Sequence, residues 1–337
     1  MLRAWVPRAG RRAAGWFLPQ QQPAPASQCL SMLRTITSPS PPSQAAPCWL
    51  HPQHRRLHVL YRDTHIIVTN KAAGVLSQPD RQTDGVATDQ LGLVRAHIKD
   101  TAGKPGDAYV GLVHRLDRNV TGCMVIALRS KAAARLSYDF KHRLVSKTYV
   151  AMVVGKWRGA GMLADNLEQS QDNVTRVLGV GVEKGKESEK ALLHYKTLGV
   201  FQHPQAGAQT LVQIRLVTGK KHQIRAQLSH LGHPIVGDVK YNAPTRFRDK
   251  FLALHCCSLA FRHPSVESLA SRDKNGHGNK KGDGDTVGKK IDQKPQRRRM
   301  TVHAPLPETW RARFGDEVVW LVEVLQRSTS EQQLPFS

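Results

Sequence analysis

The chain has 337 residues, of which 40% are hydrophobic, so it can bury a substantial core and wholesale disorder is excluded. Its 50 lysines and arginines against 26 acidic residues give a net charge of +24, which favours a polyanionic partner. No run approaches the ~18 consecutive apolar residues of a membrane-spanning helix. Five irregularly spaced cysteines favour a reducing compartment over a disulfide scaffold.

The positive charge is unevenly distributed along the chain. Residues 1–62 carry eight arginines and no acidic residue, and residues 271–300 carry ten basic and four acidic residues. The remaining residues still hold a net charge of +10. The part of the chain expected to fold is therefore basic in its own right, which makes RNA or DNA the first candidate partner.

Residues 1–56 have the composition of a transit peptide followed by a linker. On a helical wheel, seven apolar side chains of residues 2–17 fall within an arc of roughly 120°, and four arginines lie outside it. An Arg-rich, acid-free amphipathic start before a Ser-, Pro- and Gln-rich stretch is typical of organellar transit peptides. We expect the mitochondrial matrix. The alternatives are another organelle such as the chloroplast, or a basic tail that helps to hold RNA.

From residue 57 onward the hydrophobic periodicity predicts strands and helices. In chain order we expect strands at 58–61, 65–69 and 124–128, a helix at 130–143 capped by Ser130, strands at 148–154 and 210–217, a helix at 222–231 ending at Gly232, and a hairpin of strands at 252–261 and 300–304. Residues 265–299 are polar and can bury little, so we interpret them as a disordered insertion at the hairpin tip. Residues 326–337 are assigned to a C-terminal tail.

The densest group of polar residues is the segment 111–122, GLVHRLDRNVTG, which runs into an apolar strand. Asp117 lies there beside His114, Arg115 and Arg118. Between apolar stretches, an ionised carboxylate needs a fixed cation or hydrogen-bond donors to remain charged. This favours a chemical role for Asp117, although a turn aspartate that caps its own backbone explains the local pattern equally well.

A second motif comprises LVTGKKHQIR at 216–225 and GHPIVGDVKY at 232–241. A strand, a glycine turn and a helix would bring Arg225 inward beside Ile224. There Arg225 could supply the cation that Asp117 needs.

Histidines and cysteines near this motif raise the question of a zinc site. His230 and His233 straddle a helix end, and Cys256 and Cys257 are adjacent rather than separated as in CxxC. Structural zinc sites have more regular ligand spacings. We therefore interpret these residues as packing groups and expect no metal.

Together these motifs resemble, in order and spacing, the RluA family of RNA pseudouridine synthases over about residues 57–325. The resemblance implies one α+β catalytic domain with a mostly antiparallel mixed β-sheet, flanking helices and a central catalytic cleft. It also implies an RNA substrate and no cofactor. The similar segments are 59–74, the HRLD-containing 114–122, 147–151, 218–241, and the closing hairpin 254–264 with 304–307.

The resemblance implies roles for individual residues. Asp117 matches the catalytic carboxylate, Tyr149 the residue that stacks on the uracil, and Arg225 the partner that keeps the carboxylate ionised. Arg115 matches the arginine that fills the gap left by a flipped base, and Ile224 would line the other side of the ring. The further substrate-binding residues expected are His114, Arg118, Lys220 and Lys221, and the last three would hold phosphates without reading sequence.

The chain departs from the family pattern at a few positions. The family usually has Pro at the position of Ala72, Arg at Lys220, Thr or Ser at Lys221, and Thr-Ser at 120–121. None of these is a catalytic position. Many relatives also carry an S4-type RNA-binding domain at the N-terminus, but residues 1–56 are too short and too Pro-rich to form one.

We therefore expect an enzyme that isomerises specific uridines to pseudouridine in organellar ribosomal or transfer RNA. The alternative is an RNA-binding factor for mitochondrial ribosome assembly that keeps the fold without using its chemistry. The complete set of Arg115, Asp117, Tyr149 and Arg225 favours the enzyme, since a binding module has no use for a buried aspartate. An unrelated hydrolase or nuclease would need paired carboxylates or metal ligands, which the motifs lack.

Overall fold

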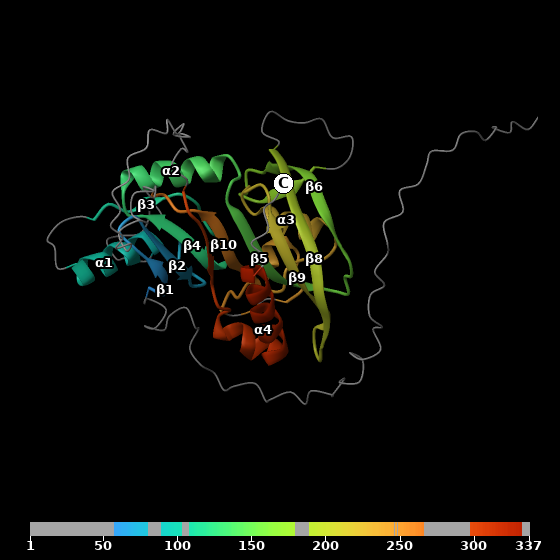
Figure 1. Ribbon diagram of the computed structural model, residues 1–337. Coiled ribbons are helices and arrows are strands. Elements are labelled where there is room, and N and C mark those ends of the chain that lie inside the picture. The colour runs from blue at the N-terminus through green and yellow to red at the C-terminus, as the bar shows by residue number, and fades with distance from the viewer. Residues whose placement is uncertain are drawn as a thin grey trace, which may run out of the picture. The chain divides into compact units, whose positions relative to one another are not determined.

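The computed structural model describes residues 57–79, 89–102, 108–178, 189–245, 247, 249–265 and 297–331. The expected transit peptide and linker at 1–56 lie outside the described residues. So does most of the expected insertion, at 266–296. Figure 1 shows the described elements as ribbons and arrows.

Within the described residues, eleven strands form one sheet in the order β1-β2-β4-β10-β5-β9-β8-β6-β7, with β11 on β10 and β3 on β4. The strand pair β4–β10 is parallel, and the other described strand pairs are antiparallel. The expected mostly antiparallel mixed sheet is thus confirmed. The strands are β1 (Val59–Arg62), β2 (Ile66–Lys71), β3 (Gly111–Leu112), β4 (Thr121–Ala127), β5 (Ser146–Val154), β6 (Ala160–Gln169), β7 (Thr175–Val177), β8 (Glu189–His203), β9 (Gly207–Leu216), β10 (Leu254–Arg262) and β11 (Arg299–His303).

Four α-helices and one short 3-10 helix accompany the sheet, and none of the described helices is long and apolar enough to cross a membrane. Figure 1 shows α2 lying along β4 and β10, and α3 near the β6–β9 half of the sheet. The helix α4 breaks at Gly315, whose φ is 80°. The helices are α1 (Gln90–Ala102), α2 (Ser130–Lys141), α3 (Gln223–His230), η4 (Val239–Tyr241) and α4 (Glu308–Glu331).

The structure confirms the predicted strands and helices, corrects the predicted N-cap and adds elements that were not predicted. The N-cap of α2 is Arg129, with extended φ and ψ, and Ser130 is already the first helical residue. Ser130 therefore cannot provide the predicted N-cap hydrogen bond, and Arg129 makes no side-chain cap bond either. The strands β3, β6, β7 and β8 and the helices α1 and α4 were not predicted. The last of these helices, α4, extends into the expected C-terminal tail, through residues 326–331.

The central strands β2, β4, β5 and β10 are almost wholly buried and position the polar segment 111–122. Gly122, the last residue of that segment, lies in β4 opposite Cys256 of β10. Its φ is +117°, and a β-carbon there would lie 2.2 Å from the Cys256 carbonyl oxygen. Only glycine permits this approach of the two strands. The approach brings the preceding loop, which carries Asp117, to the middle of the sheet.

The two ends of the expected insertion are fixed to α2 through one carboxylate. Asp139 is fully buried and accepts hydrogen bonds from Arg262 at 2.6 Å and from Arg297 at 2.6 and 3.2 Å. Arg297 also donates to the carbonyl oxygens of Arg262 and His263. Residues on both sides of segment 266–296 are therefore held in a fixed position on the sheet.

Candidate active site

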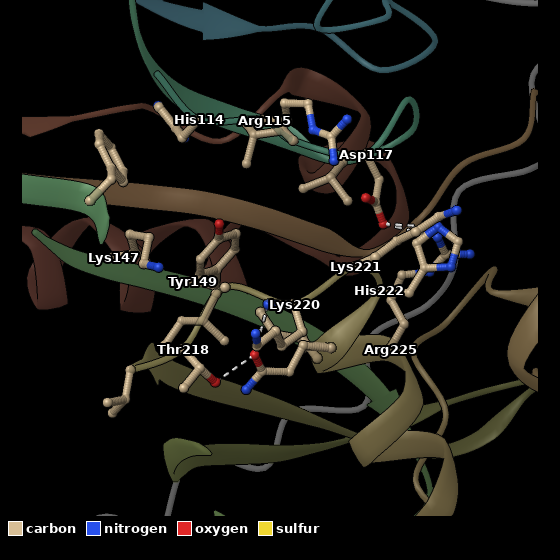
Figure 2. Close-up of a pocket in the computed structure, with 18 of the residues that line it drawn as sticks. His114, Arg115, Asp117, Lys147, Tyr149, Thr218, Lys220, Lys221, His222 and Arg225 are labelled. Atoms are coloured by element: carbon tan, nitrogen blue, oxygen red, sulfur yellow. Dashed lines mark hydrogen bonds and ion pairs between the residues drawn. The ribbon is translucent and has the colours of Figure 1, made fainter. Parts of the chain in front are cut away.

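A pocket of about 600 Å³ lies where the two polar motifs meet. Its walls come from residues 112–120, the end of α2, β5, and residues 216–225. Figure 2 shows their side chains converging on the pocket. Eight of the nine residues predicted from sequence line it: His114, Arg115, Asp117, Tyr149, Lys220, Lys221, Ile224 and Arg225.

Asp117 and Arg225 form an ion pair in this pocket. Nη1 of Arg225 donates to Oδ2 of Asp117 at 3.0 Å, although the two residues are 108 positions apart in sequence. Asp117 keeps 31% of its side chain exposed, whereas Arg225 keeps only 11%. One carboxylate oxygen is therefore held by the guanidinium, while the group as a whole stays accessible from the pocket.

A second carboxylate, that of Asp238, binds the Nε and Nη2 edge of the Arg225 guanidinium. Asp238, whose side chain is 2% exposed, accepts from Nε of Arg225 at 2.7 Å and from its Nη2 at 2.8 Å. This bidentate bond orients the planar guanidinium so that Nη1 points at Asp117. Burial by itself lowers the pKa of Arg225, but its bonds to Asp238 and Asp117 raise that pKa above the usual range. Arg225 is thus a permanent cation beside Asp117.

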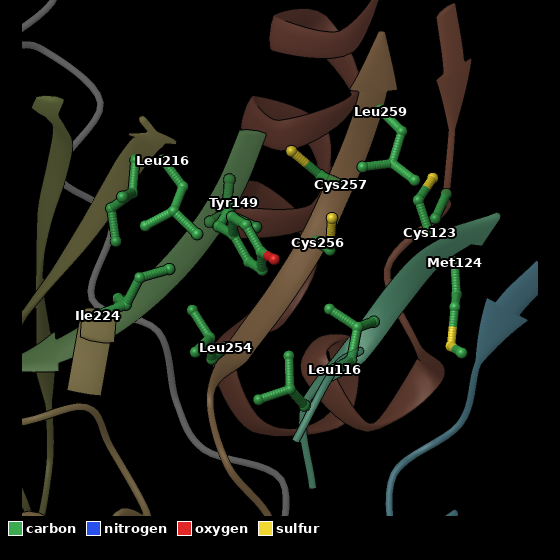
Figure 3. Packing of buried hydrophobic residues seen from close by; sticks show 14 of the residues in the cluster. Leu116, Cys123, Met124, Tyr149, Leu216, Ile224, Leu254, Cys256, Cys257 and Leu259 are labelled. Carbon is green, nitrogen blue, oxygen red and sulfur yellow. The ribbon is translucent and has the colours of Figure 1, made fainter. Parts of the chain in front are cut away.

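Tyr149 lies on β5 and contributes its ring to the pocket wall. Its side chain is almost buried, and its hydroxyl lies at Cys256 on the neighbouring strand β10 (Figure 3). Burial, with a contribution from Cys256, raises the pKa of Tyr149 well above its usual value. The phenol is therefore neutral at physiological pH. Its ring, like the side chain of Ile224, offers an apolar surface on which a planar base could stack.

His222 is a second neighbour of Asp117, and from sequence it was predicted only as part of a helix. Its Nε2 lies 3.6 Å from Oδ2 of Asp117, and its Nδ1 lies 2.9 Å from the hydroxyl of Tyr241. Burial lowers the pKa of His222 to about 4, despite the opposing charge of Asp117. The imidazole is therefore neutral near pH 7, and Arg225 is the fixed positive charge at this carboxylate.

Lys71 supports the loop of Asp117 and was also missed from sequence. It is fully buried at the end of β2, and its Nζ donates to the carbonyl oxygens of Ala72, Val75 and Arg118 at 2.7–2.9 Å. Burial lowers its pKa to about 7. The available signal was the sequence itself: a lysine closing the otherwise apolar strand IIVTNK needs acceptors if it is buried.

Two of the predicted substrate-binding residues bond to other parts of the protein. Nε2 of His114 accepts from the backbone N–H of Val125 at 3.0 Å, and its ring stacks on Phe140 at 4.6 Å. Burial, with a contribution from Lys147, lowers the pKa of His114 to about 3, so the ring is neutral. Arg118 does not line the pocket, and its Nε donates to the carbonyl oxygen of Gly74 at 3.1 Å.

The histidines and cysteines considered for zinc take part in separate packing contacts. His233 bonds to the carbonyl oxygen of Val154 and stacks on Trp157, whereas Sγ of Cys257 donates to the carbonyl oxygen of Thr148. Among the described residues, no group of three or more His, Cys, Asp or Glu side chains could hold a metal ion.

Comparisons with known proteins agree with this arrangement. Residues 65–230 match the family of RNA pseudouridylate synthases. Ribosomal large subunit pseudouridine synthase D of Pseudomonas aeruginosa is 30% identical over 280 residues, which cover 83% of this chain and 74% of the relative. tRNA pseudouridine synthase C of Pectobacterium carotovorum is 30% identical over 243 residues, covering 67% of this chain and 61% of the relative.

The fold agrees as well. The structure of human RNA pseudouridylate synthase domain containing 4 superposes with a TM-score of 0.53 at 21% identity, covering 79% of this chain and 93% of that one. The second human structure, of RNA pseudouridylate synthase domain containing 1, has a TM-score of 0.50. Given the sequence match at 30% identity over 83% of this chain, the chain belongs to the RNA pseudouridine synthases, isomerases that convert uridine to pseudouridine in RNA.

Proposed function

We propose that this protein isomerises specific uridines in ribosomal or transfer RNA, with Asp117 as the catalytic carboxylate. Relatives named as ribosomal and transfer RNA pseudouridine synthases support the substrate class. The observation that carries the proposal is the chain Asp238–Arg225–Asp117, which presents one partly exposed carboxylate to a pocket lined by Tyr149 and Ile224.

The reaction breaks the C1′–N1 bond of uridine, turns the base and joins C1′ to C5. It needs a carboxylate at the sugar, which either attacks carbon or removes a proton, in a site that limits water. Arg225 lies beside Asp117 at 3.0 Å and pairs its cation with this carboxylate. Both routes use the same carboxylate, and both leave the base detached within the pocket.

The target base must first leave its stack, because its glycosidic bond is not accessible inside a helix. Arg115 is exposed at the pocket, where it can occupy the space that the flipped base vacates. The neutral ring of Tyr149 and the side chain of Ile224 then offer apolar surfaces to the extruded uracil. Lys220 and Lys221, on the same rim, supply positive charge for the flanking phosphates.

Release of tritium from C5-tritiated uridine tests this function directly, because C5 loses its hydrogen only when pseudouridine forms. Ribosomal and transfer RNA transcripts would be assayed with the wild type, Asp117→Asn and Asp117→Ala. We expect release with the wild type and loss of at least about a thousandfold in both variants, with RNA affinity retained. Binding without release by the wild type would instead support the RNA-binding assembly factor.

We further propose that the protein acts in mitochondria, on the strength of the acid-free, Arg-rich composition of residues 1–62. Fusing residues 1–56 to a fluorescent reporter tests this. Import and cleavage of the reporter by isolated mitochondria are expected. Import that persists after the arginines of residues 1–17 are replaced by glutamate would contradict the proposal, as would uptake by chloroplasts alone.

A further inference from the structure

Lys147 lies in the active-site pocket, but it has no part in the roles proposed for Asp117, Tyr149 and Arg225. It is on β5, two residues before Tyr149, so the two side chains extend from the same face of the strand. Both line the pocket. Figure 2 shows the ammonium of Lys147 beside the ring of Tyr149, with Asp117 on the other side of that ring.

The ammonium of Lys147 has no protein partner among the described residues. No hydrogen bond or ion pair joins it to another described side chain or carbonyl, although Lys147 is largely buried. Asp117 is the only acidic residue among the described residues that line the pocket, and it is bound to Arg225. Burying a cation without a partner is costly, so this ammonium is expected to meet its partner in the ligand.

The surroundings of Lys147 keep its ammonium in place. A β-carbon on Gly219 would lie 3.2 Å from Nζ, so the bare glycine backbone leaves the room that Nζ occupies. Burial lowers the pKa of Lys147, Cys256 opposes this and Arg143 adds to it. The lysine is thus set into the pocket floor rather than extended over the rim like a phosphate-binding side chain.

We propose that Lys147 is a catalytic residue that donates a hydrogen bond to the uracil carbonyl on the side of the ring opposite the glycosidic bond. The inference rests on the proposed function. In Figure 2, Tyr149 lies between Asp117 and Lys147. With the sugar placed at Asp117 and the base on Tyr149, the far edge of the uracil would point towards Lys147. That edge carries O4 while N1 is bonded to the sugar.

The symmetry of the uracil ring explains why one donor suffices for the whole reaction. When the C1′–N1 bond breaks, its electron pair leaves on the base, and the negative charge spreads onto O2 and O4. Turning the base about its N3–C6 axis brings C5 to the place of N1 and O2 to the place of O4. A donor fixed at that place therefore meets a carbonyl oxygen before and after the turn, and it stabilises the detached anion in between.

The bond formation and proton transfers that complete the reaction do not involve Lys147. The base uses an electron pair to form the C1′–C5 bond, C5 loses its hydrogen as a proton, and N1 gains a proton. Lys147 keeps its proton throughout and acts only as a charged hydrogen-bond donor.

Single-turnover rates at saturating RNA test the role of Lys147. Lys147→Met should lower the rate by about ten- to a hundredfold, the loss expected for one hydrogen bond to a developing charge, while the Kd for RNA changes less than about threefold. Lys147→Arg, which keeps a charged donor, should recover part of the rate. Lys131→Met, an exposed lysine of α2 outside the pocket, is the matched control and should leave rate and Kd unchanged.

Substrates with sulfur in place of a carbonyl oxygen identify the atom that Lys147 contacts. A target 4-thiouridine, whose sulfur accepts hydrogen bonds poorly, should slow the wild type but should slow Lys147→Met little further. Equal slowing of both enzymes would overturn the inference. So would a Lys147→Met variant with a normal rate and a raised, salt-sensitive Kd, which would assign Lys147 to a phosphate. A wild type that forms no pseudouridine in any RNA would instead overturn the proposed function, and the role of Lys147 with it.

Discussion

At the scale of single residues, the active site depends on one guanidinium shared by two carboxylates. Arg225 makes two bonds to Asp238, which is buried, and one to Asp117, which is accessible. The two carboxylates therefore differ in position: Asp238 orients the cation, and Asp117 faces the pocket. Because the pair Arg225–Asp238 is buried, removal of one member leaves an uncompensated charge.

We expect Asp238→Ala to lower the free energy of unfolding by about 3 kcal/mol and to abolish most of the activity, since Arg225 loses its orientation. The double variant Arg225→Met with Asp238→Leu should regain much of the stability, because no unpaired charge remains buried, yet stay inactive. Urea denaturation and tritium release measure the two quantities. A double variant that is less stable than Asp238→Ala would contradict this account.

A buried histidine should make the fold sensitive to acid. His255 on β10 is fully buried, with Nδ1 at 2.8 Å from the Thr121 hydroxyl and Nε2 at 3.2 Å from the Ala304 carbonyl oxygen. Burial lowers its pKa from 6.5 to about 4. Between about pH 4 and pH 6.5, His255 is therefore protonated less in the folded state than in the unfolded state. Neutral His255 therefore contributes about 3 kcal/mol to the free energy of unfolding above about pH 6.5. This contribution is lost as the pH falls towards about 4.

Urea denaturation from about pH 7.5 to about pH 4.5 checks this contribution. His255→Gln cannot titrate there, so its stability should fall less steeply with acid than that of the wild type, although it is less stable at neutral pH. Parallel curves for the two proteins would show that His255 is not the group responsible.

The ion pair of Asp117 and Arg225 could be predicted from the sequence because both residues lie in recognisable motifs. The tasks of Asp238, His222 and Lys71 were missed. Asp238 was even part of a quoted motif, but nothing local shows that it faces Arg225, thirteen residues away, rather than solvent. Likewise, the three carbonyl oxygens that accept from Lys71 belong to two loops, which only the fold brings together.

At the scale of elements, the parallel contact between β4 and β10 decides where the loop of Asp117 lies. Gly122 makes this contact because its backbone approaches Cys256 without a side chain between them. Periodicity predicted both strands, since each is a run of apolar residues. The hydrophobic periodicity could not predict that β4 pairs with β10, because this pairing depends on contacts between residues 134 positions apart in sequence.

Gly122→Ala should therefore lower the free energy of unfolding by more than about 3 kcal/mol, through both its φ of +117° and the clash with the Cys256 carbonyl. Gly159→Ala is the matched control, because Gly159 has a φ of +113° but no atom within 4 Å of an added β-carbon. Thermal or urea denaturation should show the first change to cost at least about 2 kcal/mol more than the second. Equal losses of stability in the two variants would show that the clash with the Cys256 carbonyl contributes nothing.

The elements that the sequence analysis missed share a physical reason. The strand β8 has glycine, lysine and histidine among its fifteen residues, and its length comes from pairing with both β6 and β9. The helix α4 begins after a proline-rich segment and buries Trp310 and Val318 against the fold, while Trp320 remains exposed. Tertiary packing, rather than a clear local pattern, stabilises both elements.

At the scale of the whole molecule, the protein has a net charge of +24, and part of it comes from lysines and arginines that line the pocket. Asp117 is the one acidic residue among the described residues of that lining. Such a distribution favours RNA binding through phosphates, with affinity that depends on salt rather than on base sequence. Under the proposed function, the chemistry and the binding are separable: Asp117, Arg225 and Lys147 would act on one nucleotide, whereas the rim lysines would contact the flanking backbone.

Removing two rim charges should change the salt dependence of RNA binding and leave the chemical step alone. For Lys220→Ala with Lys221→Ala, we expect the slope of log Kd against log salt to become shallower by about 1.5, because each lost phosphate contact removes about 0.7 to 0.9. Tritium release at saturating RNA should fall less than about threefold. The charge-matched control, Lys190→Ala with Lys196→Ala on the exposed side of β8, should keep the wild-type slope. If that control flattens the slope equally, RNA is bound by the overall charge of the protein and not by the rim of this pocket.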